Sequence, residues 1–99
     1  MSTFVNGKFE WDPLKEVENI RKHGIDFQTA LEAFLDPARL IAVDEHHSAI
    51  EERLYCIGNT KSGILTVRFT VRSRIRIIGA GSWRKGKKLY EKKITKRYQ

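Results

Sequence analysis

The chain has 99 residues, 40% of them hydrophobic and 31% charged, which is the composition of an ordinary globular protein with enough residues for one core. We therefore expect a single domain over residues 1–99. No apolar run approaches the roughly 18 residues of a membrane span, and no signal-peptide stretch opens the chain. Cys56 is the only cysteine, and its apolar neighbours predict a buried, inert thiol rather than a nucleophile. The cytoplasm is the expected compartment.

The net charge of +7 is unevenly distributed along the chain. Residues 1–60 hold six Lys or Arg and eleven Asp or Glu, a net −5, whereas residues 61–99 hold thirteen Lys or Arg and one acid, a net +12. So basic a half repels itself unless an anion lies against it. Nucleic acid is the commonest such partner in a protein of this kind. The alternative is a solvated basic tail that only aids solubility.

Two helices are expected near the start of the chain, after a short hairpin whose turn is Asn6-Gly7. Asp12 can cap the first helix, Pro13 suits its first position and Gly24 suits its end. The apolar residues of this helix recur at a spacing of three and are Leu14, Val17 and Ile20. The second helix is capped by Asp26 and stopped by Asp36-Pro37, and its expected buried face comprises Phe27, Ala30, Leu31, Phe34 and Leu35.

The middle of the chain predicts a meander of about four strands. They are Leu40–Asp44, Arg53–Gly58, Ile64–Val71 and Arg74–Ala80. Strands joined by turns as short as Arg72-Ser73 must be antiparallel. The polar loop over residues 44–52 contains His46 and His47, which lack the partners of a zinc site, so no metal is expected. A basic helix over Lys87–Tyr98 ends an α+β fold of two N-terminal helices, an antiparallel sheet and a C-terminal helix.

Four arginines alternate with apolar residues in the last two strands, so one face of the sheet is core and the other is cationic. They are Arg68, Arg72, Arg74 and Arg76. Guanidinium groups match phosphate oxygens two at a time, and like charges on one sheet face are unfavourable without an anion. We expect these groups to converge on one spot where a polynucleotide backbone binds. The alternative is that each arginine pairs with a carboxylate of the acidic half.

Aromatic side chains lie among cations after the last strand. Trp83, Tyr90 and Tyr98 are interspersed with Arg84, Lys85, Lys87 and Lys88. This mixture is typical of surfaces for single-stranded RNA, because bases stack on the rings while cations follow the backbone. A core or partner-contact role is the alternative for Trp83. At the end of the first helix, Lys22 and His23 can transfer protons, although cations there also suit the helix dipole.

A series of short motifs over roughly residues 9–91 follows the order of a known family. The motifs are Phe9-Glu10-Trp11-Asp12, Asn19, Arg21–Phe27, Phe34, Asp36-Pro37, Glu51-Glu52-Arg53, Ile57-Gly58, Arg68-Phe69-Thr70, Arg74–Ile78 and Lys87–Glu91. In this combination they resemble the BrnT ribonuclease toxins. The resemblance implies a RelE-like compact fold and a metal-independent endoribonuclease that inhibits translation. It also implies a BrnA-like antitoxin partner in a 2:2 assembly, contact with DNA only through that antitoxin, and no cofactor.

One departure from the family's pattern keeps an alternative open. Many members carry Ser-Ala-Arg where this chain has Gly79-Ala80-Gly81. The missing arginine favours a catalytically degenerate module that still binds RNA or its antitoxin, with Arg84 or Lys85 as substitutes if activity is retained. A third hypothesis is an interaction subunit whose basic face meets an acidic protein.

The implied reaction activates the 2′-hydroxyl of the RNA itself, which requires a base, cations for the developing phosphorane charge, and an acid. The expected catalytic residues are Lys22, His23, Glu52, Arg53, Arg68 and Arg76, of which Arg68 and Arg76 hold the phosphate, Lys22 and His23 transfer protons, Glu52 is a possible base and Arg53 supports it. The expected RNA-binding residues are Arg72, Arg74, Trp83, Arg84, Lys85, Lys87 and Lys88.

Overall fold

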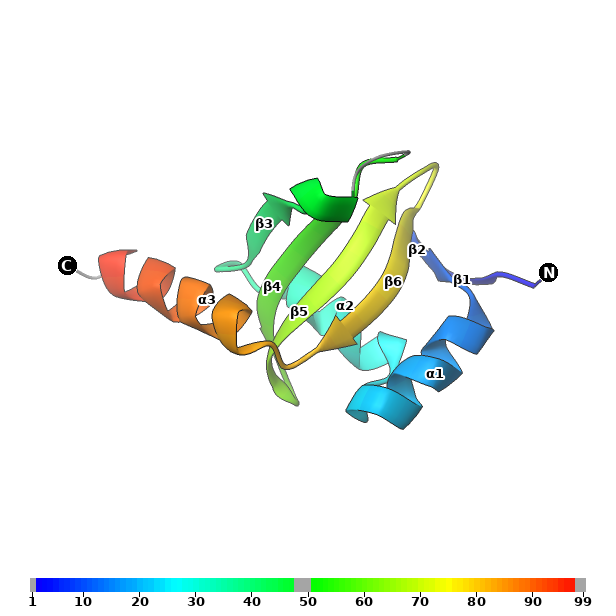
Figure 1. Cartoon of the computed structure of the whole chain (residues 1–99), viewed down its shortest axis with the longest axis horizontal. Coiled ribbons are helices and arrows are strands. Elements are labelled where there is room, and N and C mark those ends of the chain that lie inside the picture. Colours follow the sequence, from blue (N-terminus) through cyan, green and yellow to red (C-terminus); the bar gives the residue numbers. More distant parts are fainter. Residues whose placement is uncertain (1, 48–50, 98–99) are drawn as a thin grey trace.

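The structure is a computed structural model that describes residues 2–47 and 51–97. A curved sheet runs through the centre, α2 lies behind it, α1 lies beside its lower end, and α3 projects away from it towards the C-terminus (Figure 1). In chain order the elements are β1 (Phe4–Asn6), β2 (Phe9–Trp11), α1 (Pro13–His23), α2 (Phe27–Leu35), β3 (Leu40–Val43), the 3-10 helix η1 (Glu45–His47), β4 (Leu54–Thr60), β5 (Gly63–Val71), β6 (Ile75–Gly81) and α3 (Arg84–Arg97). None of these helices has the length and apolar character needed to span a bilayer.

The sheet has six strands in the order β1-β2-β6-β5-β4-β3, which corrects the predicted sheet of about four. The meander from β3 to β6 is antiparallel as expected. The two extra strands belong to the N-terminal hairpin, where Gly7 makes the turn with a φ of 60°. Because β2 pairs with β6 in parallel, the sheet is mixed. This long-range pairing places Glu10 directly beside Arg76.

Both N-terminal helices begin at the predicted caps. The Asp12 side chain accepts a hydrogen bond from the Leu14 amide, and the Asp26 side chain accepts one from the Thr29 amide. These carboxylates satisfy amide groups that have no partner within the helix. Gly24 ends α1 in the left-handed region with a φ of 70°, where a side chain would be strained.

The core lies between the sheet and α2. Trp11 and Phe27 pack edge to face in it, and the inward residues of β5 and β6 complete it. Gly58 allows α2 to approach, since a Cβ there would lie 2.4 Å from the Ala33 carbonyl oxygen. Leu35, predicted to be buried, is 77% exposed because α2 ends there. Cys56 is fully buried as predicted, and burial raises the pKa of its thiol to about 12.

The helices α1 and α3 contact the sheet differently from what their sequences suggest. The apolar stripe of α1 faces solvent, with Leu14 75% and Val17 64% exposed, while the buried residue of α1 is Asn19. The α3 helix begins at Arg84, three residues before the predicted start. Gly86 lies in the first turn of α3, where a Cβ would be 2.1 Å from the Thr66 hydroxyl oxygen, so a larger residue does not fit there. The glycine lets α3 rest directly on β5.

Candidate functional site

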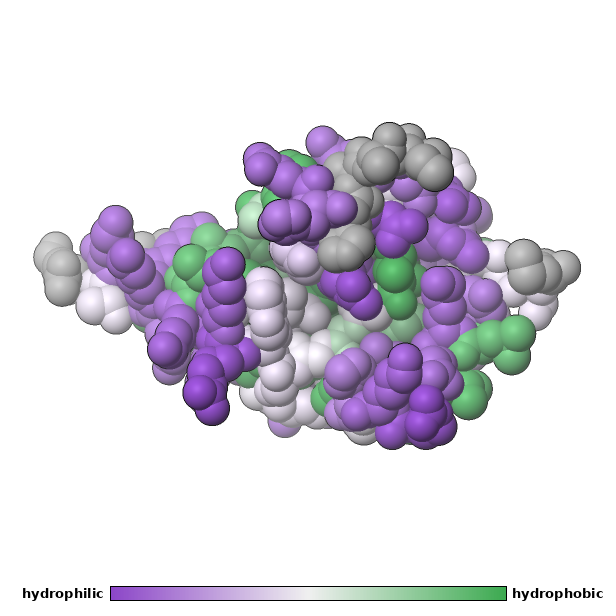
Figure 2. All heavy atoms as spheres, viewed as in Figure 1, coloured by the Kyte–Doolittle hydropathy of each residue, from purple (hydrophilic) through white to green (hydrophobic). Residues whose placement is uncertain are grey.

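The face of the sheet opposite α2 carries a cavity of about 290 Å³ between α1 and the start of α3. Hydrophilic side chains cover both helices on this face, and a paler, weakly polar region lies between them (Figure 2). The lining residues are Asn19, His23, Tyr55, Thr66, Arg68, Ala80, Gly81, Ser82 and Trp83. Three residues of the predicted site, His23, Arg68 and Trp83, therefore lie in one cavity.

Arg68 provides the cation in this cavity. It alternates with the core residues Val67 and Phe69 on β5, so its side chain lies on the open face. Its guanidinium lies over Gly79 of β6, where an added Cβ would be 3.4 Å from Nη2. Within the described part of the chain Arg68 makes no ion pair, so its charge is available to a ligand.

His23 reaches the cavity because Asn19 fixes α1 to the end of β6. The Asn19 side chain donates to the Ala80 carbonyl oxygen at 2.9 Å and accepts from the Ala80 amide at 3.1 Å. The Asn19 side-chain amide thus makes the two hydrogen bonds that a neighbouring strand would otherwise make with β6, at a point beyond the end of β2. One helical turn further on, the imidazole of His23 lies over Gly81, and an added Cβ at Gly81 would be 3.6 Å from the ring.

Replacing Asn19 with alanine should destabilise the fold by about 1–3 kcal/mol, because the buried backbone groups of Ala80 lose their partners. Thermal unfolding measures this change. The matched control is Gln28→Ala, which removes an exposed hydrogen bond to Asn6. Equal stability losses in the two variants would contradict the role given to Asn19.

The opposite side of the cavity is aromatic. The rings of Tyr55 and Trp83 lie 5.6 Å apart at a tilt of 39°, and the ammonium of Lys85 lies 5.9 Å from the centre of the Trp83 ring. Trp83 is 42% exposed, so a further planar group can stack on it. Thr66 also lines the cavity, and its buried hydroxyl has no hydrogen-bond partner among the described residues.

The surroundings of Tyr55 keep its phenol neutral. Asp44, which is only 4% exposed, is the carboxylate that acts on the Tyr55 hydroxyl. Burial and the Asp44 carboxylate together raise the pKa of Tyr55, while the charge of Arg68 lowers it to a smaller extent. The phenol is therefore protonated at neutral pH. Sequence reasoning missed both Tyr55 and Thr66, which carry no signal beyond that of ordinary strand residues.

A second hollow adjoins the first across Trp83 and is strongly basic. Its lining residues are Ser82, Trp83, Arg84, Lys87, Lys88 and Glu91. The two hollows share Ser82 and Trp83, so they form one continuous surface. The first turn of α3 also presents backbone amides, which favour anions. The predicted RNA-binding residues at the start of α3 thus adjoin the cavity.

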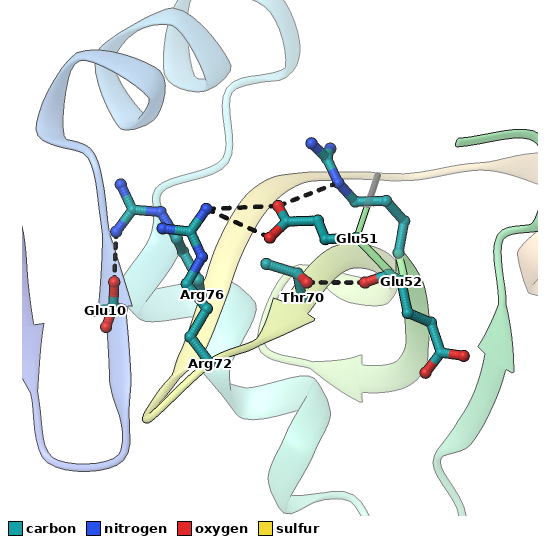
Figure 3. A network of polar contacts seen from close by, with 7 residues as sticks. Glu10, Glu51, Glu52, Thr70, Arg72 and Arg76 are labelled. Atoms are coloured by element: carbon teal, nitrogen blue, oxygen red, sulfur yellow. Dashed lines mark hydrogen bonds and ion pairs between the residues drawn. The ribbon is translucent and has the colours of Figure 1, made fainter. Parts of the chain in front are cut away.

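The remaining predicted arginines lie in a separate polar network towards the other end of the strands. Arg76 forms an ion pair with Glu10, and Arg72 contacts Glu51 at 3.4 Å (Figure 3). Arg53 lies 3.7 Å from the same Glu51 carboxylate. Glu52 contributes its backbone carbonyl to Thr70, and its carboxylate points away from the other labelled side chains (Figure 3). Carboxylates of the same molecule thus oppose most of these cations.

The structure therefore divides the predicted site instead of bringing all its guanidinium groups to one spot. Arg68 enters the cavity, whereas Arg76, Arg72 and Arg53 pair with acids, and Arg74 donates to the Gly7 carbonyl oxygen at 3.3 Å. Lys22 is exposed and pairs with Glu18, whose pKa falls to about 2 through hydrogen bonds from Arg21 and Lys22. Of the predicted aromatics, Tyr90 is buried and donates to Asp36. Tyr98 lies outside the described residues.

Comparison with known proteins identifies one family. A family model described as the ribonuclease toxin BrnT of a type II toxin-antitoxin system matches residues 11–86. The matched segment contains α1, the whole meander and the start of α3, and with them every residue that lines the cavity. No curated protein matches the chain.

Proposed function

The chain belongs to the BrnT family of ribonuclease toxins of type II toxin–antitoxin systems, and on this premise we propose that it cuts RNA in the cavity between α1 and α3. The observation that carries the proposal is the guanidinium of Arg68, which has no ion pair among the described residues and lines one cavity with His23. A cation without an internal counter-charge is available to stabilise a phosphate that gains charge in the transition state.

In the proposed reaction the RNA supplies its own nucleophile. The 2′-hydroxyl loses its proton, its oxygen bonds to phosphorus, and the 5′-oxygen leaves with a proton, which yields a 2′,3′-cyclic phosphate. Arg68 neutralises the charge on the non-bridging oxygens. The exposed imidazole of His23 is placed for one of the two proton transfers, and water exchanges the other proton.

The RNA strand is proposed to continue from the cavity over Trp83 and onto the first turn of α3. A base stacks on the exposed face of Trp83, and Arg84, Lys87 and Lys88 contact the neighbouring phosphates. Lys85 supports this arrangement through its position beside the indole. The residues that pair with carboxylates, Arg53, Arg72 and Arg76, are given no direct contact with the scissile phosphate in this proposal.

The test is incubation of the purified protein with RNA, followed by analysis of the product ends. We expect fragments that end in 2′,3′-cyclic phosphate, and growth arrest when the chain is expressed without its antitoxin. Intact RNA and normal growth would favour the catalytically degenerate module instead. That alternative is based on Gly81, which stands where many family members carry an arginine. In that case Gly81→Arg should restore cleavage, because a Cβ at this position makes only ordinary contacts with His23.

Cleavage is expected to continue in the presence of EDTA. The described groups that line the cavity are imidazole, guanidinium, hydroxyl, amide and aromatic groups, so the charge stabilisation proposed here comes from Arg68. The measurement compares cleavage rates with EDTA, with and without added Mg²⁺. A rate that collapses with chelator and recovers with Mg²⁺ would contradict the proposed mechanism.

As a type II toxin the protein has an antitoxin partner. We propose that this partner is BrnA-like, that the two form a 2:2 assembly in the cytoplasm, and that contact with DNA occurs only through the antitoxin. The family membership supports the presence of an antitoxin, and the finer statements are what the resemblance to the family implies. Light scattering of the co-expressed pair, alone and with operator DNA, tests the stoichiometry and the DNA contact.

A further inference from the structure

The α3 helix carries the basic side chains that adjoin the cavity, yet it projects away from the sheet and is largely exposed (Figure 1). Among its described side chains, the buried positions are Gly86 and Tyr90, and Tyr90 is 8% exposed. Residues four positions apart lie on the same face of a helix, and the half-buried Ile94 continues that face one turn further on. The helix therefore meets the rest of the molecule along one narrow face, which begins where Gly86 rests on Thr66 of β5.

Tyr90 supplies the hydrogen bond that joins this face to the rest of the chain. Its hydroxyl donates to Oδ2 of Asp36, which also accepts from the Asn59 amide at 2.8 Å, while Oδ1 accepts from the Ala38 amide at 2.8 Å. Burial acts to raise the pKa of Asp36, but these hydrogen bonds outweigh it and lower the pKa. Since Asp36 ends α2 and Asn59 lies on β4, one charged carboxylate connects α2, β4 and α3.

The position of α3 determines two parts of the surface assigned to RNA. The Trp83 carbonyl oxygen accepts a hydrogen bond from the Lys87 amide at 2.9 Å, so Trp83 is joined to the first turn of α3. The ring of Trp83 lies 5.6 Å from that of Tyr55 at the cavity wall. Lys87 also lines the second hollow, with Arg84 and Lys88. A rotation or displacement of α3 would therefore change the cavity and the hollow together.

We propose that Tyr90, through its hydrogen bond to Asp36, is a positioning residue that holds α3 at the rotation in which Trp83 and the basic first turns face the RNA. The inference rests on the proposed function, because it concerns the path of the RNA over α3. Being buried, the Tyr90 ring is not available to stack on a base, although its place among cations in the sequence suggested that role. Tyr90 also lies beyond the segment matched by the family model, which ends at residue 86.

The test is Tyr90→Phe, which keeps the ring and removes the hydroxyl. The probe is a 2′-O-methyl RNA of about eight nucleotides, long enough to reach α3 from the cavity and unable to be cut because it has no 2′-hydroxyl. We expect its affinity, measured by fluorescence anisotropy, to fall about 5- to 10-fold, which is the effect of losing one hydrogen bond. Amide hydrogen exchange in α3 should accelerate by a similar factor while exchange in β5 and β6 stays unchanged, because only the helix is released.

The matched control is Thr95→Ala, which removes another hydroxyl of α3, one that donates to the Glu91 carbonyl oxygen within the helix at 2.9 Å. Its RNA affinity and its exchange in the first turns of α3 should equal those of the unchanged protein. A purely structural role for Tyr90 would lower the unfolding midpoint but leave the affinity of the folded protein unaltered.

Unaltered affinity in Tyr90→Phe would therefore overturn the inference, as would exchange that rises equally in α3 and β5, or failure of the unchanged protein to bind the probe. The probe is not cut, so the outcome is separate from that of the proposed reaction. A protein that binds RNA without cutting it would contradict the reaction, and the loss of affinity in Tyr90→Phe would still support the positioning role. Cleavage by a protein whose Tyr90→Phe variant binds normally would contradict the positioning role alone.

Discussion

Replacing Arg68 with alanine should abolish growth arrest and slow RNA cleavage by about 100- to 1,000-fold, which is the usual cost of removing one donor to a developing oxyanion. Arg68 is the cavity cation without an ion pair among the described residues, so in the proposed function its charge serves a bound phosphate rather than the fold. Arg68→Lys should retain part of the activity, because an ammonium keeps the charge but loses the planar fork. The measurements are single-turnover cleavage rates and growth after induction.

Two controls make the Arg68 result interpretable. The thermal unfolding midpoint of Arg68→Ala should stay close to that of the unchanged protein, since the side chain is exposed. Arg21→Ala removes another exposed arginine, one that is 66% accessible and bonded to Glu18, and should leave cleavage unchanged. If Arg68→Ala cleaves RNA at the normal rate, the cavity is not the site of the reaction.

Replacing Arg76 with alanine should act mainly on stability, although the sequence placed this residue in the catalytic set. Its partner Glu10 is 9% exposed, so the variant leaves a nearly buried carboxylate without a counter-charge. The expected cost is about 2–4 kcal/mol, or about 10 °C or more in unfolding midpoint for a domain of this size. Thermal or urea unfolding measures the loss.

A paired variant separates the two roles of Arg76. The double replacement Glu10→Leu with Arg76→Met removes both charges and should recover most of the lost stability. It should also cleave RNA, if Arg76 does not contact the phosphate. Arg72→Ala is the control on stability, because its ion pair is 51% and 34% exposed and should contribute less than about 1 kcal/mol. A stable but inactive double variant would return Arg76 to the catalytic site.

The elements with strong local signals were predictable from the sequence. Asp12, Pro13 and Gly24 fix the limits of α1 through contacts within a few residues, and the short turns of the meander dictate antiparallel pairing. The parallel pairing of β2 with β6 was not predictable, because its partners are 66 positions apart and no turn connects them. That pairing creates the Glu10–Arg76 ion pair, so the Arg76 charge is neutralised within the protein and is not available to RNA.

The candidate site was only partly predictable for a related reason. Residue types together with the family resemblance made His23, Arg68 and Trp83 candidates for the site, since imidazole, guanidinium and indole suit RNA chemistry. They did not show which arginines meet internal carboxylates, because that depends on strand register and on the position of the acidic half. Asn19 acquires its importance from the backbone of Ala80, 61 positions away in the chain.

The buried thiol of Cys56 has a practical consequence for labelling experiments on this protein. The native chain holds no second sulfhydryl, and this one is fully buried with a strongly raised pKa, so alkylating dyes have no thiolate to attack in the folded state. A cysteine introduced at a surface position would therefore take a fluorophore or spin label selectively. Distances from such a label to bound RNA could be measured without first deleting the native residue.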